Sequence, residues 1–362
     1  MALSVGIVGL PNAGKSTLFN ALTRAGAQIG NYPFTTIEPN TGVVPVPDSR
    51  LDQLAAIFNP PRVIPATVTF TDIAGLVRGA SRGEGLGNQF LGHIRECDAI
   101  VLVARAFEDP DVSHVEGAVD PVRDLEIIDL ELQLADLETV TRRLERLEKT
   151  ARLQKDKATE AIDSLRRARD HLDSGQPVRT LDLTAEQRTH LRDLFLLTIH
   201  PLIVVVNAGE AEAGAAPPET LARLARDHGG DAMVISARIE SEIIELPPQD
   251  RRDFLDSLGL EEPGLDRLAR EAYSLLHLIT FFTAGEKEVR AWTLPRGGNA
   301  VEAAGTIHTD FARGFIRAEV VDAAELIEAG SYAAVRDAGK QRLEGRDYLV
   351  RDGDVVHFRF NV

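Results

Sequence analysis

The sequence predicts an α/β fold in which a nucleotide-binding sheet carries a helical coiled-coil insertion and is followed by a small α+β domain. Three observations predict this arrangement. Short apolar runs alternate with helical patterns in the first part of the chain, as in mostly parallel sheets. A complete phosphate-binding motif follows the first of these runs, and leucines repeat at intervals of seven in the middle of the chain.

The composition is that of a globular protein in a reducing compartment. The chain has 362 residues, a formal net charge of −16 and a single cysteine, which excludes an internal disulfide framework. The negative net charge argues against extensive nucleic-acid binding but allows a local RNA contact. The N-terminus lacks the basic segment of a signal peptide, and no apolar run reaches the roughly 18 residues of a membrane span. We therefore expect a cytoplasmic protein without a membrane partner.

Five apolar runs are expected to form buried strands, at residues 4–8, 67–71, 99–103, 202–206 and 233–235. The first four lead directly into polar or glycine-rich segments. In open α/β sheets, ligands bind at this carboxyl edge of the strands. The sequence therefore places the ligand site there.

Residues 120–200 change to a helical pattern, which we interpret as an antiparallel coiled-coil insertion. A second helix should end at Gly175, and Thr184 with Gln187 has the spacing of a capping box at the start of a third. The stripe of the first helix consists of Leu130, Leu134, Leu137, Val140, Leu144, Leu147 and Ala151. The insertion is either a packing element or an arm for a partner.

Short strand-like runs at residues 289–294, 315–320 and 355–360 alternate with glycines and helical stretches near the C-terminus. This pattern predicts a small α+β domain. We expect one domain at residues 1–280, with its insertion at about 120–200, and a second at 281–362.

Residues 9–16, Gly-Leu-Pro-Asn-Ala-Gly-Lys-Ser, match G-x-x-x-x-G-K-[ST] in full, between a predicted strand and a predicted helix. In such a P-loop, backbone N–H groups and the helix N-terminus surround phosphate oxygens. Lys15 would neutralise the β- and γ-phosphates, and the Ser16 hydroxyl would bind Mg²⁺. The predicted phosphate-binding residues are Asn12, Ala13, Gly14, Lys15, Ser16 and Thr17.

Two downstream segments fit a nucleotide-dependent switch. Asp72 and Gly75, in a D-x-x-G pattern, end the second predicted strand, where Asp72 can hold Mg²⁺ and the Gly75 N–H can contact the γ-phosphate. A threonine of the loop with Thr35 and Thr36 could reach Mg²⁺ only when a γ-phosphate is present. Leu76 stands where related GTPases place the glutamine that orients water. We therefore expect slow turnover, with water positioned by backbone groups, by a monovalent cation such as K⁺ near Asn12, or by a partner.

The segment Asn207-Ala208-Gly209-Glu210 occupies the place of the guanine-reading Asn-Lys-x-Asp. Glu210 is one methylene longer than aspartate. Ala208 lacks the aliphatic lysine side chain that would pack along the loop. The Asn207 amide could instead meet N6 and N7 of adenine, and a backbone N–H near Ala208 could meet N1. Ser236 and Ala237 would close over the base. These residues favour ATP over GTP, although guanine read by backbone groups stays open.

Together the segments at 9–17, 31–40, 72–95 and 207–210 resemble the YchF family of Obg-like ATPases. Residues 281–310 are similar to that family's TGS domain, a ubiquitin-like β-grasp. The resemblance spans essentially the whole chain and implies a P-loop ATPase with a cytoplasmic, ribosome-associated regulatory role. It assigns the family's Asn-x-x-Glu pattern to Asn207 and Glu210. Because many members have cysteine where this chain has Thr35, it makes Thr36 the Mg²⁺-sensing threonine.

Three hypotheses follow for the function. The first is a slow ATPase switch in translation or stress response, in which Lys15, Thr36, Asp72 and Gly75 act on the phosphate and Ser16, Thr36 and Asp72 surround the metal. The arm or the TGS domain would contact the ribosome, its large subunit or its RNA. The second is a guanine-specific Obg-type GTPase. The third is a nucleotide-sensing ribosome-binding module with negligible turnover.

Overall fold

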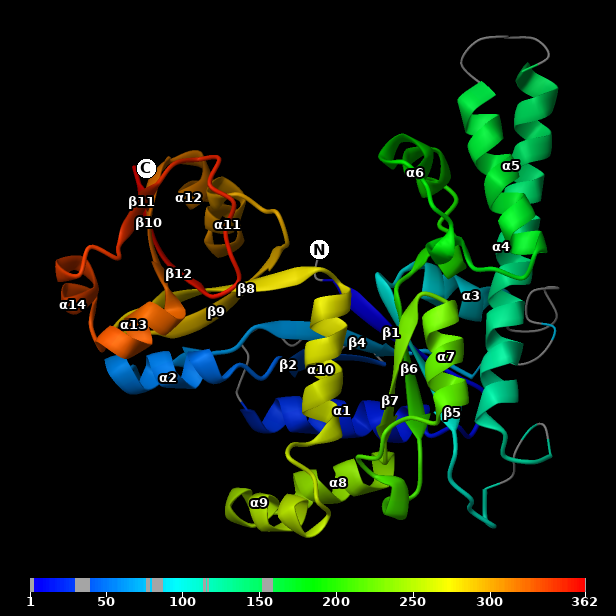
Figure 1. The fold of residues 1–362 in the computed structure, drawn as a ribbon, viewed down its shortest axis with the longest axis horizontal. Helices are drawn as coiled ribbons and strands as arrows, with labels where there is room; N and C mark the ends of the chain where they lie inside the picture. The colour runs from blue at the N-terminus through cyan, green and yellow to red at the C-terminus, as the bar shows by residue number, and fades with distance from the viewer. Residues whose placement is uncertain are drawn as a thin grey trace. The chain divides into compact units, whose positions relative to one another are not determined.

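The computed structural model describes residues 3–29, 40–75, 79, 87–112, 115, 117–151 and 159–361. The chain divides into two compact units (Figure 1). The first unit contains Met1–Val43 and Thr69–Arg267, and the second contains Val44–Val68 and Leu268–Val362. Within the described residues, every helix is too short or too polar to cross a lipid bilayer.

The first unit is built on a six-stranded sheet with the order β2-β4-β1-β5-β6-β7. β1 pairs in parallel with β4 and β5, and β6 pairs in parallel with β5 and β7. The strands are β1 (Ser4–Val8), β2 (Thr41–Pro45), β4 (Thr67–Asp72), β5 (Ala99–Arg105), β6 (Leu202–Asn207) and β7 (Gly230–Ile235). All five strands predicted from the sequence are confirmed, and β2 was not foreseen.

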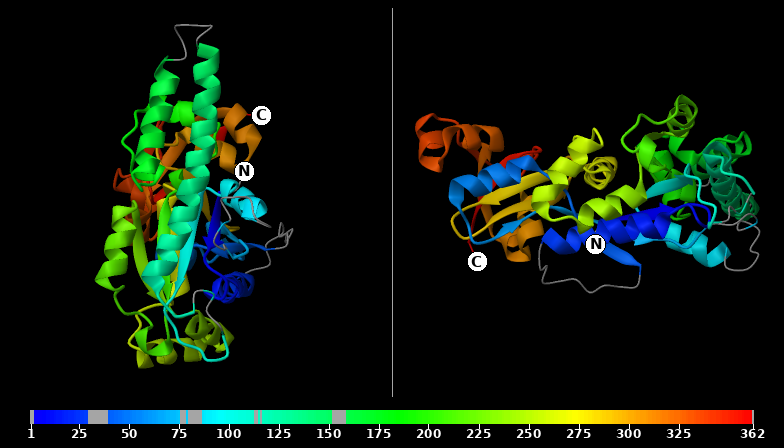
Figure 2. Two further views of the ribbon diagram at one scale, coloured as in Figure 1. Left: turned by 90° about the vertical axis from the view of Figure 1, so that its right-hand side faces the viewer. Right: turned by 90° about the horizontal axis from the view of Figure 1, so that it is seen from below.

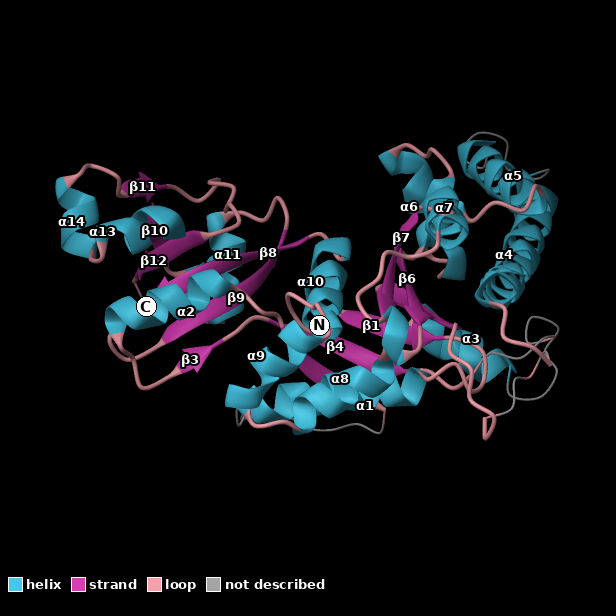
Figure 3. Cartoon of the chain, turned by 60° about the horizontal axis from the view of Figure 1, so that its bottom comes forward, coloured by secondary structure: helices cyan, strands magenta, loops and turns pink. Residues whose placement is uncertain are grey.

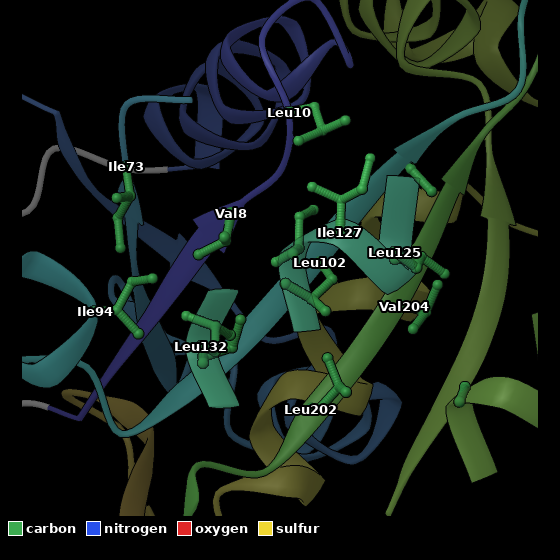
Figure 4. Packing of buried hydrophobic residues seen from close by; sticks show 14 of the residues in the cluster. Val8, Leu10, Ile73, Ile94, Leu102, Leu125, Ile127, Leu132, Leu202 and Val204 are labelled. Carbon is green, nitrogen blue, oxygen red and sulfur yellow. The ribbon is translucent and has the colours of Figure 1, made fainter. Parts of the chain in front are cut away.

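The helices of this unit are α1 (Lys15–Ile29), α3 (Gly87–Arg95), α4 (Pro121–Ala151), α5 (Thr159–Asp173), α6 (Ala185–Arg192), α7 (Glu219–Asp227), α8 (Ala237–Glu245) and α9 (Pro248–Ser257). α10 (Gly264–Leu275) runs across the boundary between the units. Central strands such as β5 are buried at every position, so their apolar runs show no alternation. The first half of α4 packs on this sheet, and Leu125 and Leu132 join Leu102 and Leu202 in one core (Figure 4).

The helical insertion is confirmed, and α4 and α5 lie side by side as an antiparallel pair (Figure 2). Arg166 of α5 pairs with Glu148 of α4 at 2.6 Å, and Val140, Leu144, Leu165 and Leu172 belong to their shared core. The predicted capping box of Thr184 and Gln187 at the start of α6 is also confirmed.

The predicted leucine stripe of α4 is wrong in its first two positions. Leu130 is 56% exposed and Leu134 is 38% exposed. The first half of α4 turns a different face, with Leu125, Ile128 and Leu132, toward the sheet. Only beyond that sheet does the helix need the seven-residue stripe, because α5 is then its packing partner.

The second unit contains a mixed sheet with the order β11-β10-β12-β8-β9-β3 (Figure 3). Phe281 packs with the core under α11, whereas the neighbouring Phe282 lies under the Arg50 guanidinium of α2, since successive strand residues face opposite sides. The elements are α2 (Ser49–Phe58), β3 (Val63–Ile64), β8 (Leu278–Ala284), β9 (Val289–Pro295), α11 (Ala300–Ile307), α12 (Thr309–Arg313), β10 (Phe315–Asp322), α13 (Ala323–Ala329), α14 (Tyr332–Asp337), β11 (Arg342–Glu344) and β12 (Asp354–Phe360).

The predicted domain boundary, between residues 280 and 281, falls within β8. The second compact unit begins earlier, at Leu268, and also takes in Val44–Val68. The reason is that β3 pairs with β9 and that α2 packs on β8 and β9. A TGS domain at 281–362 stays a prediction.

Candidate nucleotide-binding site

The loop between β1 and α1 has the backbone that its glycines allow. Gly14 adopts φ +89°, and a Cβ there would lie 2.1 Å from Nδ2 of Asn207. A Cβ on Gly9 would lie 2.5 Å from the Val103 carbonyl oxygen. Larger residues would therefore push the loop away from the sheet. The α1 helix begins at Lys15, so its free N–H groups face the loop.

Lys15 is almost fully buried, with 7% of its surface exposed. Its Nζ donates to the Leu10 carbonyl oxygen across the loop at 2.9 Å. Burial lowers the pKa of Lys15 from 10.5 to about 8, and the charge of Asp72 opposes this shift. A buried ammonium group that donates to a neutral carbonyl oxygen is poised for a stronger partner, such as a phosphate.

Ser16 and Asp72 lie together, as a shared metal site requires. The Ser16 hydroxyl donates to Oδ2 of Asp72 at 2.8 Å, and within the described part of the chain the buried Oδ1 of Asp72 has no hydrogen-bond partner. A hydroxyl beside a carboxylate oxygen that lacks a partner suits Mg²⁺, which prefers oxygen ligands. The residues present therefore fit the ion.

The D-x-x-G segment approaches the P-loop through its glycine. A Cβ on Gly75 would lie 3.0 Å from the Pro11 backbone nitrogen and 3.1 Å from its Cα. The backbone N–H of Ile73 donates to Ile7 at 3.1 Å and keeps this segment on β1. Asp72 and Gly75 are thus held against the phosphate loop. Thr35, Thr36 and Leu76 lie outside the described residues.

Asn207 ends β6 and is 4% exposed. Its Nδ2 donates to the Ala13 carbonyl oxygen at 2.9 Å, and its Oδ1 accepts from the Ala237 backbone N–H at 3.0 Å. Both ends of the amide are therefore used within the protein, where they join the P-loop to the segment after β7. The predicted contacts of this amide with N6 and N7 of adenine would compete with these bonds.

The remaining base-reading candidates surround this junction. The Ala208 N–H donates to the Ile235 carbonyl oxygen at 3.0 Å, so this particular N–H would have to give up a bond of the sheet to meet N1 of adenine. Glu210 is exposed in a short 3₁₀ turn, Glu210–Glu212. Ser236 and Ala237 are buried at the start of α8. Thr17 is exposed on the first turn of α1.

The structure therefore gathers the described candidates at the ends of β1, β4, β6 and β7, as the sequence analysis expected of a parallel sheet. It also shows one contact that the sequence pattern did not predict. The Gly79 N–H donates to Oε1 of Glu131 on α4 at 2.8 Å, and Glu131 is 7% exposed. The signal available in the sequence was a glutamate between Leu130 and Leu132 on a long predicted helix.

Comparison with known proteins gives matches over the full chain. A model of the C-terminal part of YchF-type GTPases, described as a protein of unknown function, matches residues 278–361. A model described as a 50S ribosome-binding GTPase matches residues 4–149. The ribosome-binding ATPase YchF of Bacillus subtilis (strain 168) is 52% identical, and that of Escherichia coli O157:H7 is 49% identical, each over 100% of both chains. The YchF GTPase structure from Schizosaccharomyces pombe has 36% identity and a TM-score of 0.89, covering 99% of this chain and 97% of that one.

Proposed function

Because the chain belongs to the YchF family, we propose that it is a ribosome-associated ATPase switch. The full-length bacterial relatives are named ribosome-binding ATPases. The single observation that carries the proposal is the site in which Lys15 and Ser16 of the P-loop meet Asp72 at the end of β4, where the Ser16 hydroxyl donates to the Asp72 carboxylate. In this proposal the protein works in the cytoplasm and regulates translation or the response to stress.

Within this site the chain's own groups bind and polarise the triphosphate. Lys15 and the N–H groups at the start of α1 stabilise the negative charge on the γ-phosphoryl oxygens during transfer to water. Mg²⁺ held by Ser16 and Asp72, together with Thr36, would neutralise charge on the β- and γ-phosphates. Leu76 cannot orient water, so hydrolysis is slow without K⁺ near Asn12 or contact with a partner.

The choice of ATP rests on Ala208 and Glu210. Asn207 is occupied in joining the P-loop to Ala237, so its role is to position the loops that hold the base. Discrimination then falls to the exposed Glu210 and to the absence of a lysine at 208. The names of the relatives disagree on this point, since the Schizosaccharomyces structure is called a GTPase.

We expect calorimetric titration of the nucleotide-free protein with Mg²⁺ present to favour a non-hydrolysable ATP analogue over the GTP analogue by tenfold or more, about 1.4 kcal/mol. The double variant Ala208→Lys/Glu210→Asp, which restores Asn-Lys-x-Asp, should remove or reverse this preference. Glu212→Ala, an exposed neighbour, serves as the matched control and should change nothing.

A wild-type preference for GTP would make the protein a guanine-specific GTPase of the Obg type. Equal affinity would mean that the pocket does not select the base. Nucleotide-dependent ribosome binding that persists in a variant without turnover would favour a pure sensing module.

The contact between Gly79 and Glu131 supports a route from the site to the helical arm. Gly79 follows the D-x-x-G segment, and Glu131 is on α4 beside the exposed Leu130 and Leu134. A γ-phosphate that draws Gly75 inward would act on α4 through this bond. The arm would then present its exposed leucines to the ribosome in a nucleotide-dependent way.

ATP binding should be coupled to protonation of Lys15. In the free protein its pKa is about 8, and the added phosphate charge raises it. At pH 8 about half of the molecules must therefore take up a proton on binding, and at pH 6.5 almost none. Affinity should fall as the pH rises above 8, because the neutral lysine must first be protonated. Calorimetry in buffers of different ionisation enthalpy measures this uptake, and an affinity that is flat from pH 7 to 9.5 would contradict it.

A further inference from the structure

The second unit has a surface hollow of about 460 Å³ that the nucleotide site does not use. It lies where the start of β8, the turn between β9 and α11, and the loop before β12 come together. Its lining includes Ile279, Arg296, Tyr348, Leu349, Arg351 and Asp352. Such a volume accommodates a small ligand of a few rings or one nucleotide.

The hollow carries uncompensated positive charge. Arg296 and Arg351 are both exposed, and neither guanidinium has an acidic partner among the described residues. The one carboxylate in the lining, Asp352, is already committed. Its Oδ2 pairs with Arg50 at 2.8 Å, and its Oδ1 accepts from the Thr280 N–H at 2.8 Å. Two guanidinium groups are therefore free for an anion in a chain whose overall charge is −16.

The rest of the lining is apolar. Ile279 is 2% exposed and forms part of the floor, whereas Leu349 is 59% exposed at the rim. The Tyr348 hydroxyl donates to Oδ2 of Asp354 at 2.7 Å, which holds this lining residue in place. An exposed leucine beside a fixed aromatic ring suits a flat organic group attached to the anion.

The two walls of the hollow are tied together by the backbone. The Ala300 N–H donates to the Tyr348 carbonyl at 2.9 Å, and the Val350 N–H donates to the Gly298 carbonyl at 3.0 Å. The turn that bears Arg296 and the loop that bears Arg351 are thus joined by two hydrogen bonds. A preformed site pays little conformational entropy on binding.

We propose that this hollow binds a nucleotide phosphate between Arg296 and Arg351, with the sugar or base against Leu349 and Tyr348. The proposal rests on the ribosome association proposed above, because the ribosome offers such nucleotides as RNA. A free nucleotide has the same chemistry, and the experiment separates the two sources.

The test uses the full chain with its P-loop saturated by ADP and Mg²⁺, and measures the fluorescence anisotropy of a labelled single-stranded hexauridylate. The double variant Arg296→Ala/Arg351→Ala should bind at least tenfold more weakly than the wild type. Two phosphate contacts on a single strand predict a slope of about −1.4 for log affinity against log salt, and the variant should lose most of it. The control Arg313→Ala/Arg317→Ala removes the same charge from exposed positions outside the hollow and should change affinity less than twofold.

Competition with uridine monophosphate shows whether the ligand of the hollow is a free nucleotide or an RNA strand. If it displaces the RNA from the wild type, a free nucleotide suffices; if only RNA competes, the ligand is a nucleic-acid strand. Absence of RNA binding by the wild type, or equal weakening by both double variants, would overturn the proposal. If the ATPase proposal fails but this one holds, the protein will bind the RNA and will not bind ATP.

Discussion

Replacing Lys15 with alanine is expected to weaken ATP binding at least about a hundredfold while leaving the nucleotide-free fold no less stable than the wild type. The loss of affinity follows because a buried ammonium group facing a triphosphate contributes about 3 kcal/mol through charge-assisted hydrogen bonds. The unchanged fold follows from the pKa of Lys15, which burial lowers from 10.5 to about 8. Keeping that group charged at pH 7 costs about 3 kcal/mol, and alanine removes this cost.

Titration calorimetry measures the affinity, and thermal unfolding of the nucleotide-free variant measures the stability. Lys287→Ala is the matched control, because Lys287 is exposed in the second unit. It should leave both quantities at wild-type values. Tight ATP binding by Lys15→Ala would remove the basis for the phosphate site. A strongly destabilised variant would mean that Lys15 acts through the fold instead.

The loop between β1 and α1 was predictable because the residues that shape it are adjacent in the sequence. Gly14 must take a positive φ and Ser16 must follow Lys15 at the start of a helix, so one short motif specifies the loop. The buried strands were predictable for a similar reason. A continuous apolar run such as β5, which is buried at every position, fits only a strand in the middle of a sheet.

The hydrogen-bond partners of Asn207 could not be predicted from the same residues. Its amide joins Ala13 to Ala237, residues that are far from it and from each other along the chain. The sequence pattern identifies the end of a strand, but it does not show which of several nearby polar groups a buried side chain will hydrogen-bond. The contact of the Asn207 amide with the base stays a prediction, and it would compete with these two bonds.

The division of the chain was also beyond the sequence pattern. Residues 44–68 join the second unit because Val63 and Ile64 pair with Val289 and Arg290 of β9. Two-residue strands leave no periodicity to detect. The leucine stripe failed at Leu130 and Leu134 for a related reason, since a helix that changes packing partner along its length has no single buried face.

Replacing Asp136 with alanine is expected to lower the free energy of unfolding by about 3 kcal/mol at pH 5, the largest stability effect we predict. Asp136 is fully buried at the centre of α4, and it accepts hydrogen bonds from the Leu197 N–H at 2.8 Å, the Thr198 N–H at 2.8 Å and the Thr198 hydroxyl at 2.7 Å. These bonds connect the base of the helical arm to the segment before β6. Alanine would leave three buried donors without an acceptor.

The effect should shrink as the pH rises, and its sign follows from the pKa of Asp136. Burial raises that pKa from 3.8 to about 6, so the folded wild type gains a stabilising contribution below pH 4 and loses it as the pH rises through 6. The alanine variant has no such group, so its deficit should be smaller at pH 8 than at pH 5. Urea unfolding followed by circular dichroism at both values measures this, with the exposed Asp163→Ala on α5 as control, expected within about 0.5 kcal/mol of wild type. An equal loss of stability at both pH values would show that Asp136 holds the arm without titrating. If the variant is as stable as the wild type, the three hydrogen bonds of Asp136 do not anchor the arm.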